Sequence, residues 1–295
     1  MKERIRFRRP PSRPRRVPGP RRLSVVRYLN TAPLIWGLER GPQRRRYQLS
    51  FTVPATCAED LGSGRADIGI LPVFAYQTIP GLKVIPHIAI TSQRKVESVL
   101  LVSRGPARRA KRVALDASSR TSAALVKILF ARHWGRSPDY VEAAPDLAAM
   151  LSEADAALVI GDPALRFSLH APGTQRLDAE NLHVYDLGEE WWRLTNLPFV
   201  FAFWAVRAES VGSADEKHTL VRDFCRSRDE GLEHLDEIAH EAAAKLQLPG
   251  GQLERYLRYS IDYRLDAPQQ AGLEYFFRYA HELGLLDEVR PVEFL

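Results

Sequence analysis

The sequence predicts an α/β protein made of two lobes with a ligand-binding cleft between them. Three observations predict this class. Short apolar runs alternate with helical periodicity from residue 23 onward, a central segment can be removed without breaking that alternation, and polar residues follow several strands directly before a helix. The 295 residues are also enough for two lobes that each bury a core.

The first part of the chain is expected to begin with a strand at 23–26 and a helix at 33–40. Apolar Leu23, Val25 and Val26 form the strand, and Pro33 suits the first turn of the helix. The other elements expected here are strands at 47–53, 66–72 and 98–103 and a short helix at 58–63. The stretch "RGPARRAK" then separates this part from the next.

The second part repeats the alternation of strands and helices. Its first helix, from about Thr121 to Trp134, carries Leu125, Ile128 and Leu129 on one face. The other elements expected here are strands at 112–116, 156–160 and 199–206, a helix from Pro163, and C-terminal helices of which the last has an aromatic face.

The division into lobes follows from the segment 103–198. Its removal leaves one piece that ends in a strand and one that begins with a strand, so 98–103 and 199–206 are expected to cross between the lobes as a hinge. The predicted units are a first lobe of 23–102 with 199–295 and a second lobe of 103–198. Ligands of such folds bind in the cleft, at the carboxyl ends of strands.

The remaining unit is a basic tail at 1–22, which is expected to be disordered and dispensable. It holds ten Lys or Arg and one Glu, a charge of +9, so the rest of a chain with net charge +6 carries −3. A slightly acidic body argues against nucleic acid as a partner of the folded part, although the tail alone leaves RNA or membrane-surface contact open.

Several other classes are excluded by composition. Apolar runs are shorter than the ~20 residues of a membrane span. Cys57 and Cys225 lie far apart, which fits a reduced, cytoplasmic compartment, and the histidines have no metal-ligand spacing, so no metal is expected. The sequence also has no phosphate-binding glycine loop and no GxSxG nucleophile motif.

Polar residues stand between a strand and a helix at three places, "RYLNTAP", "DASSRTS" and "IGDPA". A helix N-terminus offers free N–H groups and a positive dipole end, which favour a carboxylate or phosphate. Each residue could equally be an ordinary helix cap. Asp162 most resembles a pure cap, and Thr31 can cap the first helix, which would leave Asn30 free to face the cleft.

Ser98, Thr195 and Asn196 lie at the expected hinge strands, where either ligand contact or ordinary turn chemistry is possible. Aromatic residues near them are expected in the core: Trp191, Trp192, Phe199, Phe203 and Trp204. The residues alone thus indicate a two-lobed receptor for a small anionic molecule, without establishing catalysis.

Several stretches together resemble the MqnA/MqnD family of the futalosine route to menaquinone, and most closely its MqnA branch, the chorismate dehydratases. They include "VVRYLNTAPLIWGL", "DIGILPVFAY", "LDASSRTSAALVKILF", "ALVIGDPAL" and "LPFVFAFWAV", in the family's order. The resemblance covers nearly all of 23–295. Two positions depart from the family's usual pattern, with Arg27 in place of Ser and Asn196 in place of Gly.

The resemblance implies a type II periplasmic-binding-protein fold used as a cytoplasmic enzyme. The implied enzyme is a carbon-oxygen lyase that converts chorismate to 3-[(1-carboxyvinyl)oxy]benzoate and water, without a cofactor or metal. Asn30 and Ser98 are the expected catalytic residues. The expected substrate-binding residues are Tyr28, Thr31, Pro72, Ser119, Thr121, Ser122, Gly161, Asp162, Thr195 and Asn196. A non-catalytic binding protein or sensor for a small anion, on the same fold, is the alternative.

Overall fold

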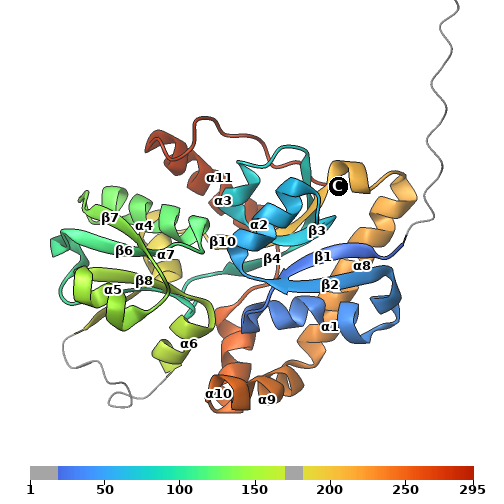
Figure 1. Ribbon diagram of the computed structural model, residues 1–295, viewed down its shortest axis with the longest axis horizontal. Coiled ribbons are helices and arrows are strands. Elements are labelled where there is room, and N and C mark those ends of the chain that lie inside the picture. Colours follow the sequence, from blue (N-terminus) through green and yellow to red (C-terminus); the bar gives the residue numbers. More distant parts are fainter. Residues whose placement is uncertain (1–18, 170–181) are drawn as a thin grey trace, which may run out of the picture.

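The computed structural model describes residues 19–169 and 182–295 of the chain, and the prediction made for 1–18 lies outside these residues. Two five-stranded sheets lie next to each other, and helices pack on both (Figure 1). Within the described part, no helix is long and apolar enough to cross a membrane.

The first sheet has the strand order β2-β1-β3-β10-β4. Its strands are β1 (Arg21–Val26), β2 (Tyr47–Thr52), β3 (Ile68–Pro72), β4 (Leu82–Ser92) and β10 (Phe199–Arg207). β1 runs parallel to β2 and β3, whereas β10 is antiparallel to both β3 and β4. The carboxyl ends of three parallel strands therefore meet at one edge of this sheet.

The second sheet repeats this plan with the order β7-β6-β8-β5-β9. Its strands are β5 (Val99–Ser103), β6 (Arg112–Asp116), β7 (Asp139–Ala143), β8 (Ala156–Ile160) and β9 (His183–Asp186). β6 is parallel to β7 and β8, and β5 is antiparallel to β8 and β9. Each half thus has a central parallel strand, and an antiparallel strand that enters from the other half.

The helices of the two halves differ in number and length. Those next to the first sheet are α1 (Ala32–Arg40), α2 (Pro54–Ser63), α3 (Val73–Tyr76), α8 (Ala214–Glu233), α9 (Leu235–Leu246), α10 (Gly250–Arg255) and α11 (Ala267–Glu282). Those of the second sheet are α4 (Arg120–Arg132), α5 (Leu147–Glu153), α6 (Gly161–Leu169) and α7 (Leu187–Thr195). Short 3-10 turns occur at Leu29–Thr31, Pro42–Arg46, Ala107–Arg109 and Ala208–Ser210.

One expected boundary is corrected by the sheet topology. The strand predicted at 98–103 as part of the first lobe and its hinge is β5, which pairs on both sides with strands of the second sheet. Side-chain pattern alone could not assign it, because all five of its residues are buried. The chain passes between the sheets at 93–98 and at 196–198 instead.

Three strands were not predicted, namely β4, β7 and β9. In the sequence, Pro86 argues against a strand at β4. In the structure, the next residue, His87, has a φ of +66°, which is rare for a residue other than glycine. A proline is tolerated because β4 lies at the edge of its sheet, where Val84 and Thr91 are bridged by C-terminal residues of the chain.

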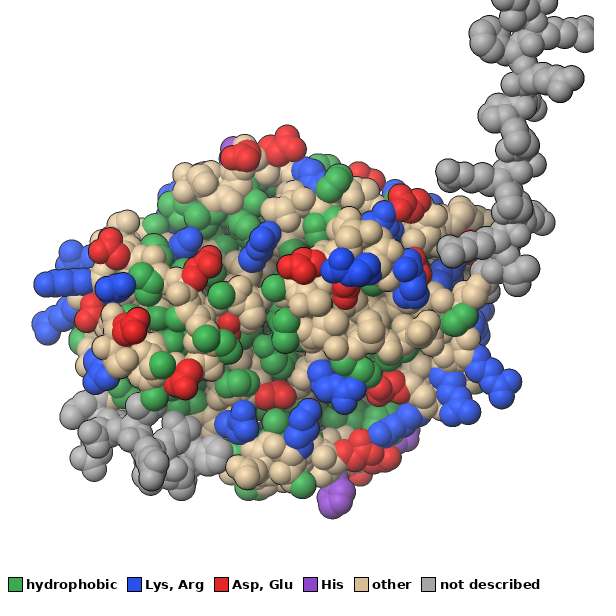
Figure 2. Space-filling model, in the orientation of Figure 1, with side chains coloured by type: hydrophobic (Ala, Val, Ile, Leu, Met, Phe, Trp, Pro, Cys, Tyr) green, Lys and Arg blue, Asp and Glu red, His purple; other side chains and the backbone are tan. Residues whose placement is uncertain are grey.

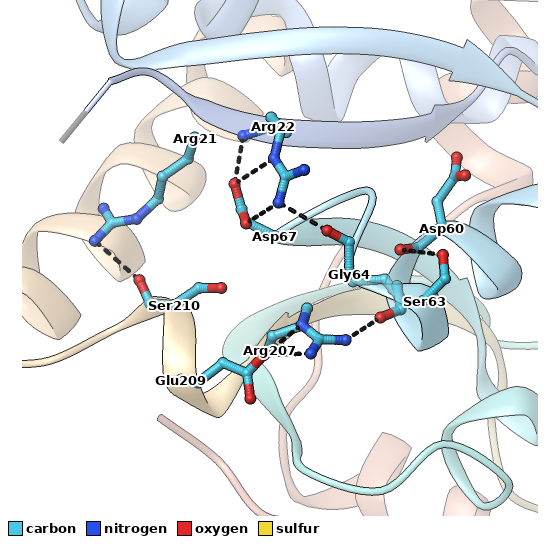
Figure 3. Close-up of polar contacts among 10 residues, drawn as sticks. Arg21, Arg22, Asp60, Ser63, Gly64, Asp67, Arg207, Glu209 and Ser210 are labelled. Carbon is cyan, nitrogen blue, oxygen red and sulfur yellow. Dashed lines mark hydrogen bonds and ion pairs between the residues drawn. The ribbon is translucent and has the colours of Figure 1, made fainter. Parts of the chain in front are cut away.

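The chain enters β1 two residues earlier than predicted, so Arg21 and Arg22 belong to the sheet and not to the tail. Arg22 faces Asp67, and its guanidinium lies 2.7 Å from that carboxylate (Figure 3). Arg207, at the end of β10, donates to the carbonyl of Leu61 at 2.5 Å, beside the same corner. The first contact ties the start of β1 to the residue before β3, and the second ties the end of β10 to α2.

The aromatic residues predicted for the core are mostly where they were expected. Trp191, Phe199, Phe203 and Trp204 are buried, whereas Trp192 is half-buried. Trp191 of α7 packs edge-to-face on Phe199 and on Phe276 of α11, so this cluster joins elements of the two halves. The body of the protein shows acidic and basic side chains interspersed on the face seen in Figure 2.

Candidate active site

A cavity lies between the two sheets, at the ends of β1, β3, β5 and β8. Of the residues predicted to act on a substrate, those that line it are Tyr28, Asn30, Thr31, Pro72, Ser98, Ser119, Thr121, Ser122 and Gly161. The rest of its wall is mainly apolar, with Val26, Ile70, Ile90, Val96, Val99, Ile160 and Phe201. No charged side chain occurs among the described residues of this wall.

The first lobe contributes the turn from Tyr28 to Thr31. Leu29–Thr31 form a 3-10 turn that continues directly into α1, and neither this turn nor α1 is capped by the side chain of its own N-cap residue. The prediction that Thr31 caps α1 is therefore wrong, because the turn already places Thr31 in a helical conformation. Asn30 lines the cavity, and its side-chain oxygen accepts a long contact, 3.5 Å, from the Thr31 hydroxyl.

Asp162 caps this turn from the other lobe. Its Oδ1 accepts a hydrogen bond from the Leu29 N–H at 2.9 Å, and it faces a second surface pocket, not the cavity. The interpretation of Asp162 as a cap of its own helix is thereby corrected. Burial is the main influence that raises the pKa of Asp162, while the bond from Leu29 works in the opposite direction.

The N-terminus of α4 is the second lobe's contribution. Ser119 is its N-cap, accepting from the Ser122 N–H at 3.4 Å and donating to the Ser122 hydroxyl at 3.0 Å. Thr121 reaches across the cavity, where its hydroxyl accepts from the Phe74 N–H at 3.0 Å. This hydrogen bond gives the Phe74 N–H, in the first turn of α3, an acceptor that the helix's own N-cap residue does not provide.

Tyr28 and Gly161 form a third contact between the lobes. Gly161 has a φ of +66°, and a Cβ at this position would lie 2.6 Å from the Tyr28 ring. Only glycine therefore fits here. Burial, then the nearby carboxylates of Asp116 and Asp162, raise the pKa of Tyr28 to about 12, so its phenol stays neutral at physiological pH.

Ser98 stands directly before β5 and is buried. Its hydroxyl accepts a hydrogen bond from the Tyr256 phenol at 2.9 Å. The segment before Ser98 is held by Asp186, whose carboxylate accepts from the Val96 and Glu97 N–H groups. Sequence reasoning did not single out Tyr256, since a tyrosine in a helical pattern gives no signal of a partner far away in the chain.

Thr195 and Asn196 do not line the cavity, so their assignment as substrate-binding residues is corrected. The Thr195 hydroxyl donates to the Trp191 carbonyl at 2.9 Å, within α7. Asn196 ends that helix with a φ of +57°, the conformation that glycine commonly supplies. Both residues have a structural role at the end of a helix.

Arg27, the other departure from the family pattern, also lies outside the cavity. Its guanidinium is stacked 3.7 Å from the centre of the Phe51 ring, beside the second pocket. Across residues 19–169 and 182–295 there is no group of three or more His, Cys, Asp or Glu that could hold a metal ion.

Solved structures place this arrangement in a known fold class. A protein of Archaeoglobus fulgidus superposes with a TM-score of 0.72 at 17% identity, covering 90% of this chain and 98% of the other. The periplasmic aliphatic sulphonate binding protein of Escherichia coli gives 0.60 at 17% identity, with 94% of both chains covered. The fold is therefore that of the periplasmic binding proteins, whose ligand cavity lies between two lobes, as predicted.

The sequence itself decides the family. Residues 21–282 match the family described as "Menaquinone biosynthesis", and the chain belongs to it. A chorismate dehydratase of Thermus thermophilus is 32% identical over 274 residues, which are 89% of this chain and 95% of that protein. The resemblance on which the sequence-based expectations rest is thus confirmed.

Proposed function

We propose that this protein is a chorismate dehydratase, which converts chorismate to 3-[(1-carboxyvinyl)oxy]benzoate and water. One observation supports this most strongly: a cavity lined by an amide, hydroxyls and the N-terminus of α4 occurs in a chain 32% identical to a chorismate dehydratase. Such groups hold the two carboxylates of chorismate without a charged side chain. We also propose that the enzyme acts in the cytoplasm.

The reaction removes the proton at ring carbon C3 and the hydroxyl at C4, which leave together as water. The C3–H electron pair forms the new ring double bond as the C4–O bond breaks, and the ring becomes aromatic. Atoms and electrons balance without an oxidant or a reductant. Aromatisation supplies a large driving force, so the protein's main tasks are to position the substrate and to exclude water.

The cavity side chains indicate how the proton moves. Its described wall carries no Asp, Glu, His or Lys, and Tyr28 stays neutral, so no side chain there is suited to act as a base at C3. We propose that a carboxylate of the substrate takes the C3 proton and passes it to the C4 hydroxyl, which leaves as water. Asn30 and Ser98 then bind the C4 hydroxyl and a substrate carboxylate, stabilising the hydroxyl as it leaves.

Incubation with chorismate, followed by mass spectrometry, tests this proposal. The expected product is lighter than chorismate by one water and absorbs as a benzoate. The Asn30→Ala variant serves as a matched control, since any contaminating activity would survive this change. Chorismate that binds in the cavity but is recovered unchanged would favour the alternative, a binding protein or sensor, and would overturn the assignment as an enzyme.

A further inference from the structure

Tyr256 lies behind the cavity and donates a hydrogen bond to Ser98, one of the two residues assigned to catalysis. It begins a π-helix, Tyr256–Ser260, directly after α10, and is only 1% exposed. A π-helix widens the helical turn and is common at functional sites. Because the chain between Ser98 and Tyr256 is long, the contact exists only in the folded protein.

We propose that Tyr256 is a positioning residue of the active site, one that sets the direction of the hydrogen bond made by Ser98. The inference rests on the proposed dehydratase function and adds a residue to it. Tyr256 does not itself contact substrate, because it is absent from the residues that line the cavity.

The contact with Tyr256 determines which hydrogen bonds the Ser98 hydroxyl accepts and which it can donate. A neutral phenol has one proton, and Tyr256 donates it to Ser98 Oγ at 2.9 Å. Ser98 must then send its own proton elsewhere. The described protein acceptor for it is the Val96 carbonyl at 3.4 Å, well beyond the ~2.7–2.8 Å typical of such bonds. Ser98 is therefore held as a donor whose proton is available to a substrate oxygen.

Tyr256 is not suited to transfer protons itself. Burial is the main influence, and the carboxylates of Asp162 and Glu97 add to it, so the pKa of Tyr256 lies far above that of a free tyrosine. The nearby Ser98 and Asn30 side chains lower this pKa, but they only partly oppose the shift. The phenol thus keeps its proton throughout the working pH range and acts as a fixed donor and acceptor.

Tyr263 provides a matched control within the same region. It is buried like Tyr256, and its hydroxyl has no hydrogen-bond partner among the described residues. The Tyr263→Phe variant removes a hydroxyl of the same kind, from the same neighbourhood, without breaking a hydrogen bond. Its folding and turnover are expected to match those of the wild type.

The test compares kcat and KM for chorismate in the wild type, Tyr256→Phe, Tyr263→Phe, Ser98→Ala and the double variant Ser98→Ala with Tyr256→Phe. We expect Tyr256→Phe to lower kcat by about 10- to 100-fold, the scale of losing a partner that orients a functional group, with little change in KM. If Tyr256 acts through Ser98, the double variant is no slower than the slower single variant.

Other outcomes would overturn the inference. A Tyr256→Phe variant with normal kcat would do so, as would fully additive effects in the double variant or an equal loss in Tyr263→Phe. A Tyr256→Phe variant that fails to fold would assign the phenol a structural role instead. A wild-type chain that leaves chorismate unchanged would overturn both the proposed function and this inference. If the wild type is active, the result for Tyr256→Phe tests this inference alone.

Discussion

The two lobes have the same strand order, yet the helices that face the cavity begin differently. In the second lobe, α4 is capped by Ser119, its own neighbour in the chain. In the first lobe, the turn at Leu29 and the start of α3 have no cap from the side chains of their own N-cap residues. Their N–H groups are bound by Asp162 and Thr121, which come from the second lobe.

This difference gives the contact between the lobes a physical cause. Buried N–H groups without a partner are costly, and the first lobe satisfies two of its helix starts only when the second lobe lies against it. It also leaves Asn30 free of capping, so that its amide can serve a ligand. Equal topology therefore does not imply equal roles. The second lobe closes the site, and the first supplies Asn30 to it.

The largest expected effect comes from Asn30. Because its amide lines the cavity and caps no helix, Asn30→Ala should lower chorismate turnover by ~10²–10³-fold, the scale of losing one preorganised donor. Its melting temperature should stay near the wild-type value. Ser119→Ala is the contrasting change, expected to cost about 1 kcal/mol of stability as a lost cap, with a smaller loss of turnover. An unstable but fully active Asn30→Ala protein would contradict the comparison.

Gly161→Ala should have the next largest effect. The added Cβ would lie 2.6 Å from the Tyr28 ring, in a backbone conformation that disfavours alanine, so the lobes cannot meet as before. Misplacement by about 1 Å lowers kcat/KM on the order of 10²-fold. Steady-state kinetics measure the loss, and the double change with Tyr28→Ala should partly restore activity if the clash is the cause. No recovery would mean that Gly161 acts in another way.

Thr121→Val should loosen the closed form without changing the shape of the side chain. The Phe74 N–H loses its acceptor, and a buried N–H without a partner costs ~1–3 kcal/mol. Since that cost falls on the closed form, KM should rise by about tenfold for each 1.4 kcal/mol. Small-angle scattering with saturating ligand should show less compaction than in the wild type. Equal KM and equal radius would remove Thr121 from the closing contacts.

The smallest effect is expected for Asp162→Asn, and it depends on pH. Burial raises the pKa of Asp162 in the folded protein above its value in the unfolded chain. The carboxyl therefore makes its full contribution to stability when the pH is below the unfolded pKa. This contribution is lost as the pH rises through the folded pKa. The amide of Asn still accepts from Leu29 but has no charge to desolvate. The variant should therefore gain stability over the wild type as pH rises from about 4 to 7.

The expected gain for Asp162→Asn is no more than about 2–4 °C in Tm, which corresponds to ~1 kcal/mol. Lys245 and Arg166 face Asp162 and favour its charged form, so high salt should enlarge the difference. A wild type that is more stable than the variant at neutral pH would show that the charge strengthens the contact between the lobes.

The sequence by itself determined where most strands end and helices begin, because those signals are local. The apolar run before Tyr28, the Ser119 cap and the glycine at 161 can each be recognised within a few residues, and the cavity contains all three positions. Local signals failed at β4, where Pro86 masked an edge strand, and at Thr195 and Asn196, whose chemistry fits a helix end and a binding site equally well.

Only the tertiary structure decided which groups are joined across the cleft. Asp162 and Leu29 are 133 residues apart, Tyr256 and Ser98 are 158 apart, and no local pattern relates the members of either pair. The physical reason is that a hydrogen bond depends on position in space, whereas capping and periodicity depend on position along the chain. A carboxylate before a helix therefore suggests a cap from its sequence, and the packing of the two lobes decides which helix it caps.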